Sequence, residues 1–282
     1  MSITFTQLHG FASLQDHGRP GLAHLAIPTA GAFDTASHDL ANRILGNHVD
    51  CVTVEFLRSN AQFVAHHNID ICLTGAPVDI RIDGRIVEMN VSQHVAAGAQ
   101  VSIQSVHLGM RTYLAVRGGL QVEKILGSAS YDELARIGNP PLVAQQSLAV
   151  GADTVGEVPH QYAVIPGIAL GNEVELRVFK GPRWDFFDSQ QFLNAQFSVS
   201  SKCNRVGVRL EGTPLTWDSS QRLPSEGVAL GSIQVPVDGV PLIFGPDHPT
   251  TAGYPVIAVV DAADMSKVAQ LSPGTKIRFS VQ

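Results

Sequence analysis

The sequence predicts a mainly β protein of the β-rich α+β kind, built as two barrel-like subdomains. Short segments in which apolar and polar residues alternate dominate it, and Gly, Asp, Asn or Pro bound most of them. Helical patterns are few, and a similar turn-and-strand pattern occurs near both ends. Residues 146–173 contain glycines and two prolines with little periodicity. We therefore expect subdomains over residues 1–170 and 171–282.

The strands of the first half follow one another closely. Residues 69–74 (IDICLT) alternate, and residues 78–82 (VDIRI) alternate again before Asp83-Gly84, a type I′ hairpin signal. The predicted strands that follow are residues 85–89, 100–104 and 112–116.

Three segments are predicted to be helical. Residues 36–45 place Leu40, Ala41 and Ile44 on one face, with Asp34 or Thr35 as the N-terminal cap and Gly46-Asn47 as the stop. The other two are residues 184–192 and 264–271.

Two turns near the C-terminus resemble two in the first half. Asp238-Gly239 resembles Asp83-Gly84, and residues 274–279 resemble residues 98–103. Two subdomains of similar plan would explain this, as would the reuse of common turns in β-rich chains. Both explanations stay open at this stage.

Composition excludes some functions. The 282 residues are 44% hydrophobic and 16% charged, as in globular proteins. A net charge of -6 and a pI of about 6.0 argue against a nucleic-acid partner, which needs clustered Lys and Arg. Three cysteines without a CxxC pair indicate reduced thiols. No signal peptide or apolar span is visible, so we expect a cytoplasmic protein with no membrane partner.

Distinctive motifs occur along the whole chain. In the first half these are residues 14–21 (LQDHGRPG), 27–34 (IPTAGAFD), 40–47 (LANRILGN), 73–76 (LTGA), 115–119 (AVRGG) and 126–128 (LGS). In the second half they are residues 204–212 (NRVGVRLEG), 225–239 (SEGVALGSIQVPVDG) and 247–255 (DHPTTAGYP). In order and spacing these motifs resemble the KipA family, which is also known as the C-type subunit of 5-oxoprolinase or as allophanate hydrolase subunit 2.

The resemblance implies two cyclophilin-like β-barrel subdomains. It also implies that the chain is half of a urea carboxylase-type, biotin-dependent carboxyltransferase domain, whose other half is a KipI-like, B-type subunit. The sequence departs from the family pattern at Thr29 and Ala30, at Ala252 and Val256, and in residues 132–141, which lack a glycine-rich stretch. The first two departures touch candidate site loops, so they bear on which substrate is used.

Residues 247–254 form the densest group of functional side chains. Asp247 is interpreted as a general base, or as the group that orients His248. Thr250 and Thr251 are candidates to bind a carboxylate or ureido group, and Tyr254 is a further catalytic candidate. The structural alternative is that Asp247 caps a turn and Tyr254 packs on the barrel.

Other candidates lie outside this loop. Glu226 is a candidate acid and Gln234 a candidate amide ligand, if both face the same side of the barrel. Arg205 and Arg209 would share one strand face and bind an anion, or form salt bridges instead. The remaining substrate-binding candidates are Asp34, which would otherwise cap a helix, and Asn42.

No metal or cofactor site is expected in this chain. His66-His67 is interpreted as a surface doublet, and His17, His24 and His38 are scattered. Neither a P-loop nor a GxSxG elbow occurs, so any ATP would bind a partner and an autonomous serine hydrolase is disfavoured.

Three functions remain open. The first is a component of an ATP-dependent 5-oxoprolinase complex that opens the 5-oxoproline lactam to glutamate. This component would work with the KipI-like, B-type subunit, together with a lactam-hydrolase, A-type subunit, and would be inactive alone. The second is carboxyl transfer from carboxybiotin to urea or a related amide, with biotin supplied in trans. The third is a KipA-like regulator that binds a KipI-like kinase inhibitor.

Most of the candidate site residues should meet in the folded chain. Asp247, Thr251, Tyr254, Glu226, Gln234 and Arg205 would line one cleft, with Asp34 and Asn42 near its rim. Asp247→Asn would then abolish the activity of the complex and leave the melting temperature nearly unchanged.

Overall fold

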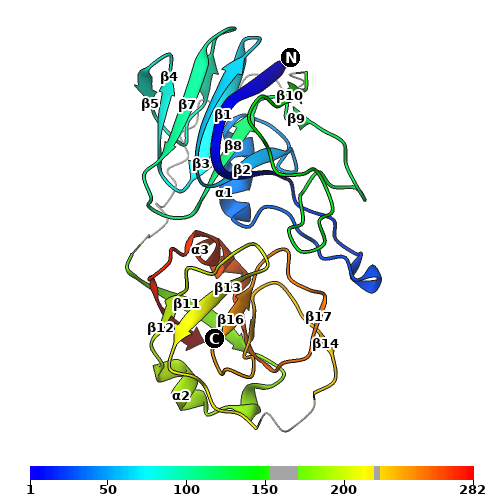
Figure 1. The fold of residues 1–282 in the computed structure, drawn as a ribbon, viewed down its shortest axis with the longest axis vertical. Helices are drawn as coiled ribbons and strands as arrows, with labels where there is room; N and C mark the ends of the chain where they lie inside the picture. Colours follow the sequence, from blue (N-terminus) through cyan, green and yellow to red (C-terminus); the bar gives the residue numbers. More distant parts are fainter. Residues whose placement is uncertain (153–170, 219–222) are drawn as a thin grey trace. The chain divides into compact units, whose positions relative to one another are not determined.

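The computed structural model describes residues 1–152, 171–218 and 223–282, and its chain forms two compact units (Figure 1). The first unit comprises Met1–Arg19, Asp34–Tyr131 and Arg136–Ile168. The second comprises Pro20–Phe33, Asp132–Ala135 and Ala169–Gln282. Two short segments from the first half of the sequence therefore belong to the second unit. The boundary predicted near residue 170 lies outside the described residues.

The first unit is a branched antiparallel sheet around one apolar core. Its main path runs β5-β4-β7-β2-β1-β10-β9, and β8 joins β2 to β3, which also pairs with β6. The strands are β1 (Ser2–Gln15), β2 (Thr53–Ala65), β3 (Ile69–Gly75), β4 (Val78–Ile82), β5 (Arg85–Val87), β6 (Gln93–Val95), β7 (Gln100–Ser105), β8 (Arg111–Val116), β9 (Leu120–Gln121) and β10 (Ser147–Val150). The predicted strands of this half are confirmed, as is the β4–β5 turn, where Asp83 and Gly84 both have positive φ.

Helix α1 (Thr35–Ile44) packs against β3 and β8 with a largely polar face. Its buried residues are Ser37, His38, Ala41 and Asn42, whereas Leu40 and Ile44 are only partly buried. Ala41 and Ile44 of the predicted apolar face pack against Cys72 and Ala115, but polar residues share the buried side of the helix. The buried polar side chains are tolerated because the chain after the helix satisfies them: Asn42 donates to the carbonyl oxygens of Val49 and Cys51.

A buried polar network lies at the start of α1. Asp34 caps the helix by accepting from the backbone N–H of Ser37. The Asp34 N–H donates to the Tyr113 hydroxyl at 2.8 Å, and that hydroxyl donates to Glu55 Oε2 at 2.7 Å. Burial, followed by the neighbouring Glu55 carboxylate, raises the pKa of Tyr113 well above its usual value. The phenol therefore stays protonated and keeps donating.

Asp16, in the LQDHGRPG motif, anchors the turn after β1. Its buried carboxylate accepts from the hydroxyls of Ser128 and Ser130 and from the N–H groups of Ala129 and Gly18. Burial alone would raise the pKa of Asp16, but these hydrogen bonds outweigh it and lower that pKa. This motif residue ties two distant segments of the first unit together.

The second unit contains a closed barrel in the order β11-β18-β15-β16-β13-β12-β19. Its strands are β11 (Glu173–Lys180), β12 (Phe197–Val199), β13 (Gly207–Gly212), β15 (Ser232–Gln234), β16 (Leu242–Phe244), β18 (Val256–Val260) and β19 (Lys276–Val281). A separate pair, β14 (Glu226–Gly227) and β17 (Thr251–Ala252), lies outside the barrel. The mainly β prediction is confirmed.

The helices of the second unit are short. The predicted helix over residues 184–192 is instead a 3₁₀ turn, η2 (Trp184–Phe186), and α2 (Ser189–Asn194). The break arises because Asp188 caps a new helix, accepting from the N–H groups of Gln190 and Gln191. The helix predicted near residue 264 is η3 (Ala262–Asp264) followed by α3 (Met265–Gln270). None of the described helices, including η1 (Ala23–Leu25), is long and apolar enough to cross a membrane.

Of the two similarities between the halves of the sequence, the one between residues 98–103 and 274–279 has a matching hydrogen-bond pattern. Gly98 N–H donates to the Ala65 carbonyl at the end of β2, and Ala65 N–H donates back to Ala99. Gly274 N–H likewise donates to Val199 at the end of β12, and Val199 N–H donates to Thr275. The β2–β7 and β12–β19 pairs are therefore closed in the same way. The two Asp-Gly turns differ: Asp83 and Gly84 both have positive φ, whereas in Asp238-Gly239 only the glycine does.

We predict that Tyr113→Phe lowers the free energy of unfolding by about 1–3 kcal/mol, because it leaves buried polar partners without the hydroxyl. Urea denaturation measures this change. Tyr131→Phe is the matched control, since the Tyr131 hydroxyl makes no side-chain hydrogen bond within the described residues and should change stability little. Equal effects of the two variants would contradict the role given to Tyr113.

We predict that the stability difference between the wild type and Asp16→Asn is largest near neutral pH. The folded-state pKa of Asp16 is depressed, so its stabilisation is present above the unfolded pKa of about 3.9 and is lost as the pH falls through the folded value. Urea titrations from pH 7 to pH 3 should show the gap narrowing. Exposed Asp79→Asn should show no such trend, and a pH-independent gap for Asp16 would refute the assignment.

Candidate functional site

The loop of residues 247–255 lies between β16 and β18 and starts at a buried ion pair. Arg205 Nε donates to Asp247 Oδ2 at 2.8 Å, and its terminal nitrogen donates to Oδ1 at 2.9 Å. The arginine side chain is 2% exposed and the carboxylate is fully buried. Such a two-pronged pair fixes the relative orientation of both groups.

Two segments from the first half of the sequence complete this pair within the second unit. Arg205 also donates to the Gly31 carbonyl at 2.7 Å, and the Glu133 N–H donates to Asp247 Oδ2 at 2.8 Å. Ala30, a departure from the family pattern, holds a left-handed φ of 55° while its N–H donates to Pro246. The ion pair therefore joins four segments that are far apart in sequence.

This geometry changes the interpretation of Asp247. A general base needs to reach a substrate proton, but both oxygens of this carboxylate accept internal hydrogen bonds and have no exposure. Asp247 does not orient the His248 ring either, because that ring bonds the Pro249 carbonyl. We therefore assign Asp247 to holding the loop in place.

His248 is a candidate that the sequence analysis left outside its site residues. Its Nδ1 lies 2.7 Å from the Pro249 carbonyl oxygen, which can only accept, so Nδ1 carries the proton and Nε2 carries the lone pair. Burial lowers the pKa of His248, although the Pro249 hydrogen bond and Asp247 oppose this. The ring is therefore neutral at pH 7, and Nε2 has no hydrogen-bond partner within the described residues. This arrangement suits a general base.

The structure brings the SEG, IQVP and DHPTT segments together, as the sequence predicts. Glu226 pairs with Ala252, and Gly227 with Thr251, in the β14–β17 ladder. The buried Gln234 side chain donates to the Tyr254 carbonyl at 3.3 Å. Gln234 therefore supports the backbone of the loop.

Three predicted side chains of the residue 247–255 loop remain accessible. Thr251 is exposed, Thr250 is partly exposed and Tyr254 is 46% exposed. Glu226 is partly exposed and forms a short ion pair with Arg183, a partner that no sequence pattern indicates because it lies 43 residues away. The loop thus exposes two hydroxyls and a phenol to solvent, while buried hydrogen bonds hold its backbone in place.

Arg209 lies apart from this loop. The strand β13 begins at Gly207, so Arg205 precedes it and the two arginines do not share a strand face as expected. Arg209 is exposed and lines a pocket of about 430 Å³ with Lys202 and Glu211. That pocket has none of the other candidate residues in its lining.

Asp34 and Asn42 belong to the first unit and have structural contacts there. Asp34 caps α1, and Asn42 bonds the chain after the helix and also accepts from Asn47 at 3.1 Å. Within the described part of the second unit, no three His, Cys or carboxylate ligands gather as a metal site would require.

Residues 25–281 match the carboxyltransferase domain, subdomain A and B, and the chain therefore belongs to this family.

Named relatives make the comparison more specific. The C-type subunit of 5-oxoprolinase from Escherichia coli (strain K12) is 31% identical over 277 residues, which cover 95% of this chain and 87% of that protein. Urea amidolyase of Lachancea kluyveri is 30% identical over 95% of this chain but only 16% of its own length. The crystal structure of Kluyveromyces lactis urea carboxylase has a TM-score of 0.89 at 27% identity, covering 99% of this chain and 27% of that one.

We predict that Asp247→Asn destabilises the protein, contrary to the expectation from sequence. It leaves the buried Arg205 guanidinium without its counter-charge, which costs about 3–5 kcal/mol in comparable buried pairs. Thermal and urea unfolding measure the loss, with exposed Asp185→Asn as the control. An unchanged melting temperature for Asp247→Asn would show that the pair is not a structural anchor.

Proposed function

We propose that this chain is the C-type subunit of an ATP-dependent 5-oxoprolinase complex, which opens the lactam of 5-oxoproline to glutamate. The observation that carries the proposal is the match to the Escherichia coli 5-oxoprolinase relative, which spans most of both chains. A second protein of the same name, from Haemophilus influenzae, is 29% identical over 95% of this chain.

The chemistry needs activation because a lactam is stabilised by resonance. Phosphorylation of the lactam oxygen would make its carbon open to attack by water. The proposed role of this chain is to bind and hydrolyse the activated lactam. His248 would accept the proton of the attacking water through Nε2, and the Thr250 and Thr251 hydroxyls would bind the substrate carboxylate.

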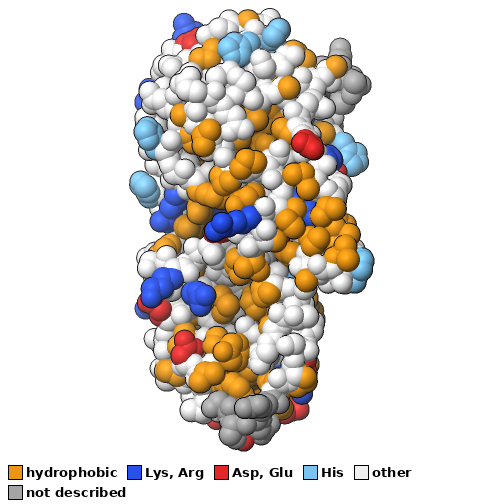
Figure 2. Space-filling view, turned by 45° about the vertical axis from the view of Figure 1, so that its right-hand side comes forward, with side chains coloured by type: hydrophobic (Ala, Val, Ile, Leu, Met, Phe, Trp, Pro, Cys, Tyr) orange, Lys and Arg blue, Asp and Glu red, His pale blue; other side chains and the backbone are white. Residues whose placement is uncertain are grey.

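ATP and the remaining components would come from outside this chain. The sequence has no P-loop, so we assign ATP binding to a partner. In the view of Figure 2, apolar side chains are exposed on each unit, with basic side chains scattered singly or in small groups. The exposed apolar residues of the second unit include Leu25, Leu134, Leu230 and Val237. Exposed apolar side chains of this kind are consistent with docking of a KipI-like, B-type subunit.

Carboxyl transfer is the second candidate, favoured by the family description and by the urea amidolyase relatives. Under it, carboxybiotin on a separate carrier would deliver the carboxyl group to urea or a related amide. The same loop would then bind a ureido group through Thr250 and Thr251. The two functions can be told apart by their cofactor, because only carboxyl transfer requires biotin.

We predict that the purified chain alone turns over no 5-oxoproline, and that activity requires ATP together with the KipI-like and lactam-hydrolase partners. In the reconstituted complex, His248→Gln should lower kcat by about 10²-fold or more, as expected for loss of a general base. Release of glutamate and ADP measures this. His67→Gln, at an exposed histidine, is the control and should keep full activity.

Two outcomes would contradict the proposal. ATP-driven turnover by the single chain would remove the need for partners. Carboxylation of urea in the presence of carboxybiotin, without any lactam opening by the reconstituted complex, would assign the chain to the second function. Full lactam-opening activity of the His248→Gln complex would be compatible with the proposed function but would show that another residue is the general base.

A further inference from the structure

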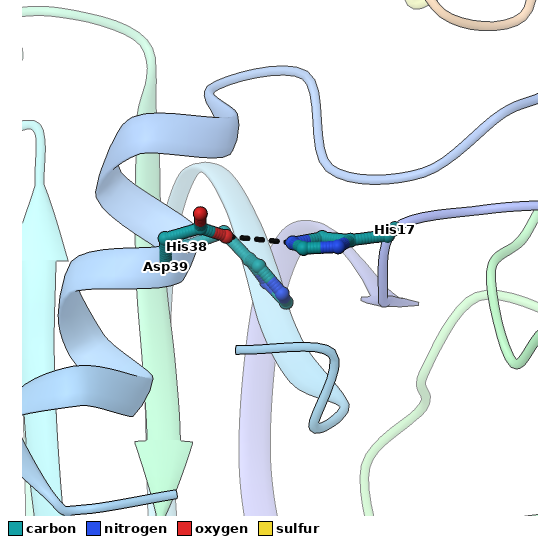
Figure 3. Close-up of side chains that lie close together, drawn as sticks. All are labelled: His17, His38 and Asp39. Carbon is teal, nitrogen blue, oxygen red and sulfur yellow. Dashed lines mark hydrogen bonds and ion pairs between the residues drawn. The ribbon is translucent and has the colours of Figure 1, made fainter. Parts of the chain in front are cut away.

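The first unit gathers two imidazoles and a carboxylate that are scattered in the sequence. Figure 3 shows the His17 ring reaching toward Asp39 of α1, with the His38 ring beside them. His17 Nε2 lies 2.7 Å from Asp39 Oδ1, and one ligand atom from each of the three residues lies within 4.8 Å of the others. Sequence spacing does not indicate this cluster, because folding places the turn after β1 against the helix.

We propose that His17, His38 and Asp39 bind a divalent transition-metal ion, with zinc as the best-matched ion. Two neutral imidazoles and one carboxylate give a set of net charge -1, and nitrogen and oxygen ligands of this kind suit Zn²⁺. Three protein ligands leave a fourth tetrahedral position for water or a small ligand. The site lies wholly within the first unit and does not involve the residue 247–255 loop.

The hydrogen bonds of His38 already resemble those of a metal ligand. Its Nε2 lies 3.0 Å from the Val49 carbonyl oxygen, which can only accept, so Nε2 carries the proton and Nδ1 the lone pair. Histidine ligands commonly donate their second N–H to a backbone carbonyl in this way, which fixes the ring.

Binding requires two local exchanges. The Thr53 hydroxyl, now 2.8 Å from His38 Nδ1, would turn toward the Gln15 carbonyl, which lies 3.5 Å away. The ion would also take the place of the His17–Asp39 hydrogen bond, and the three ligand atoms would draw together to about 3.3 Å, the separation set by tetrahedral zinc bonds of about 2.0 Å.

Neighbouring groups hold the ligands and leave an entry path. The backbone N–H of His17 donates to Asp50 Oδ1 at 3.1 Å, and Arg43 lies 3.4 Å from Asp39 Oδ2, opposite the ligand oxygen. The His17 side chain is 36% exposed, whereas His38 is fully buried. An ion would therefore reach the site from the His17 side.

Isothermal titration of the full chain with Zn²⁺ tests the proposal. We expect one Zn²⁺ per chain for the wild type, a rise in melting temperature with Zn²⁺, and tetrahedral visible absorption when Co²⁺ replaces it. His17→Ala and Asp39→Asn should weaken binding by at least about tenfold. Both side chains lie near the surface, so these variants should fold, which circular dichroism checks. His67→Ala, at an exposed histidine, is the matched control.

The binding of Zn²⁺ by these variants distinguishes the cluster from the surface histidines. Loss of binding in His17→Ala and Asp39→Asn, with full binding in His67→Ala, supports the site. No Zn²⁺ binding by the wild type, or equal binding by all four proteins, overturns it. Loss of binding only in His67→Ala would place the ion on the surface histidines and would overturn it as well.

Discussion

The buried Arg205–Asp247 ion pair is the interaction on which the second unit depends. It joins the chain near residues 31, 133, 205 and 247 through hydrogen bonds of 2.7–2.9 Å. A buried charge is costly unless it is paired and fully hydrogen-bonded, so loss of either partner would destabilise the chain that packs around the other. Gly245 allows this approach, because a side chain there would meet the Arg205 carbonyl at 2.3 Å.

Around this loop, buried side chains with internal partners lie next to accessible ones. Asp247 and Gln234 use their polar atoms on internal partners, whereas Thr251 and Tyr254 remain exposed just beyond them. His248 lies between the two groups, with one ring nitrogen held by Pro249 and the other carrying a lone pair. A rigid base with a few accessible polar groups is the arrangement that precise positioning of a substrate requires.

The first unit relies on the same principle with different residues. Tyr113, Asp34 and Glu55 form a buried network beneath α1, and Asp16 ties the turn after β1 to the segment near residue 129. These contacts place His17 beside Asp39, since His17 follows the anchored Asp16 directly. Motif residues such as Asp16 and Asp34 therefore have structural roles in this unit.

The sequence by itself determined the strand pattern and the Asp83-Gly84 hairpin, because alternation and turn chemistry are local properties. Only the tertiary structure decided that Asp247 is buried against Arg205, that α1 buries His38 and Asn42, and that Asp188 splits a predicted helix. Burial and partners depend on residues up to 174 positions apart, as between Gly31 and Arg205. No local pattern encodes such a separation, because the free energy of a buried polar group is set by the partners that folding brings to it.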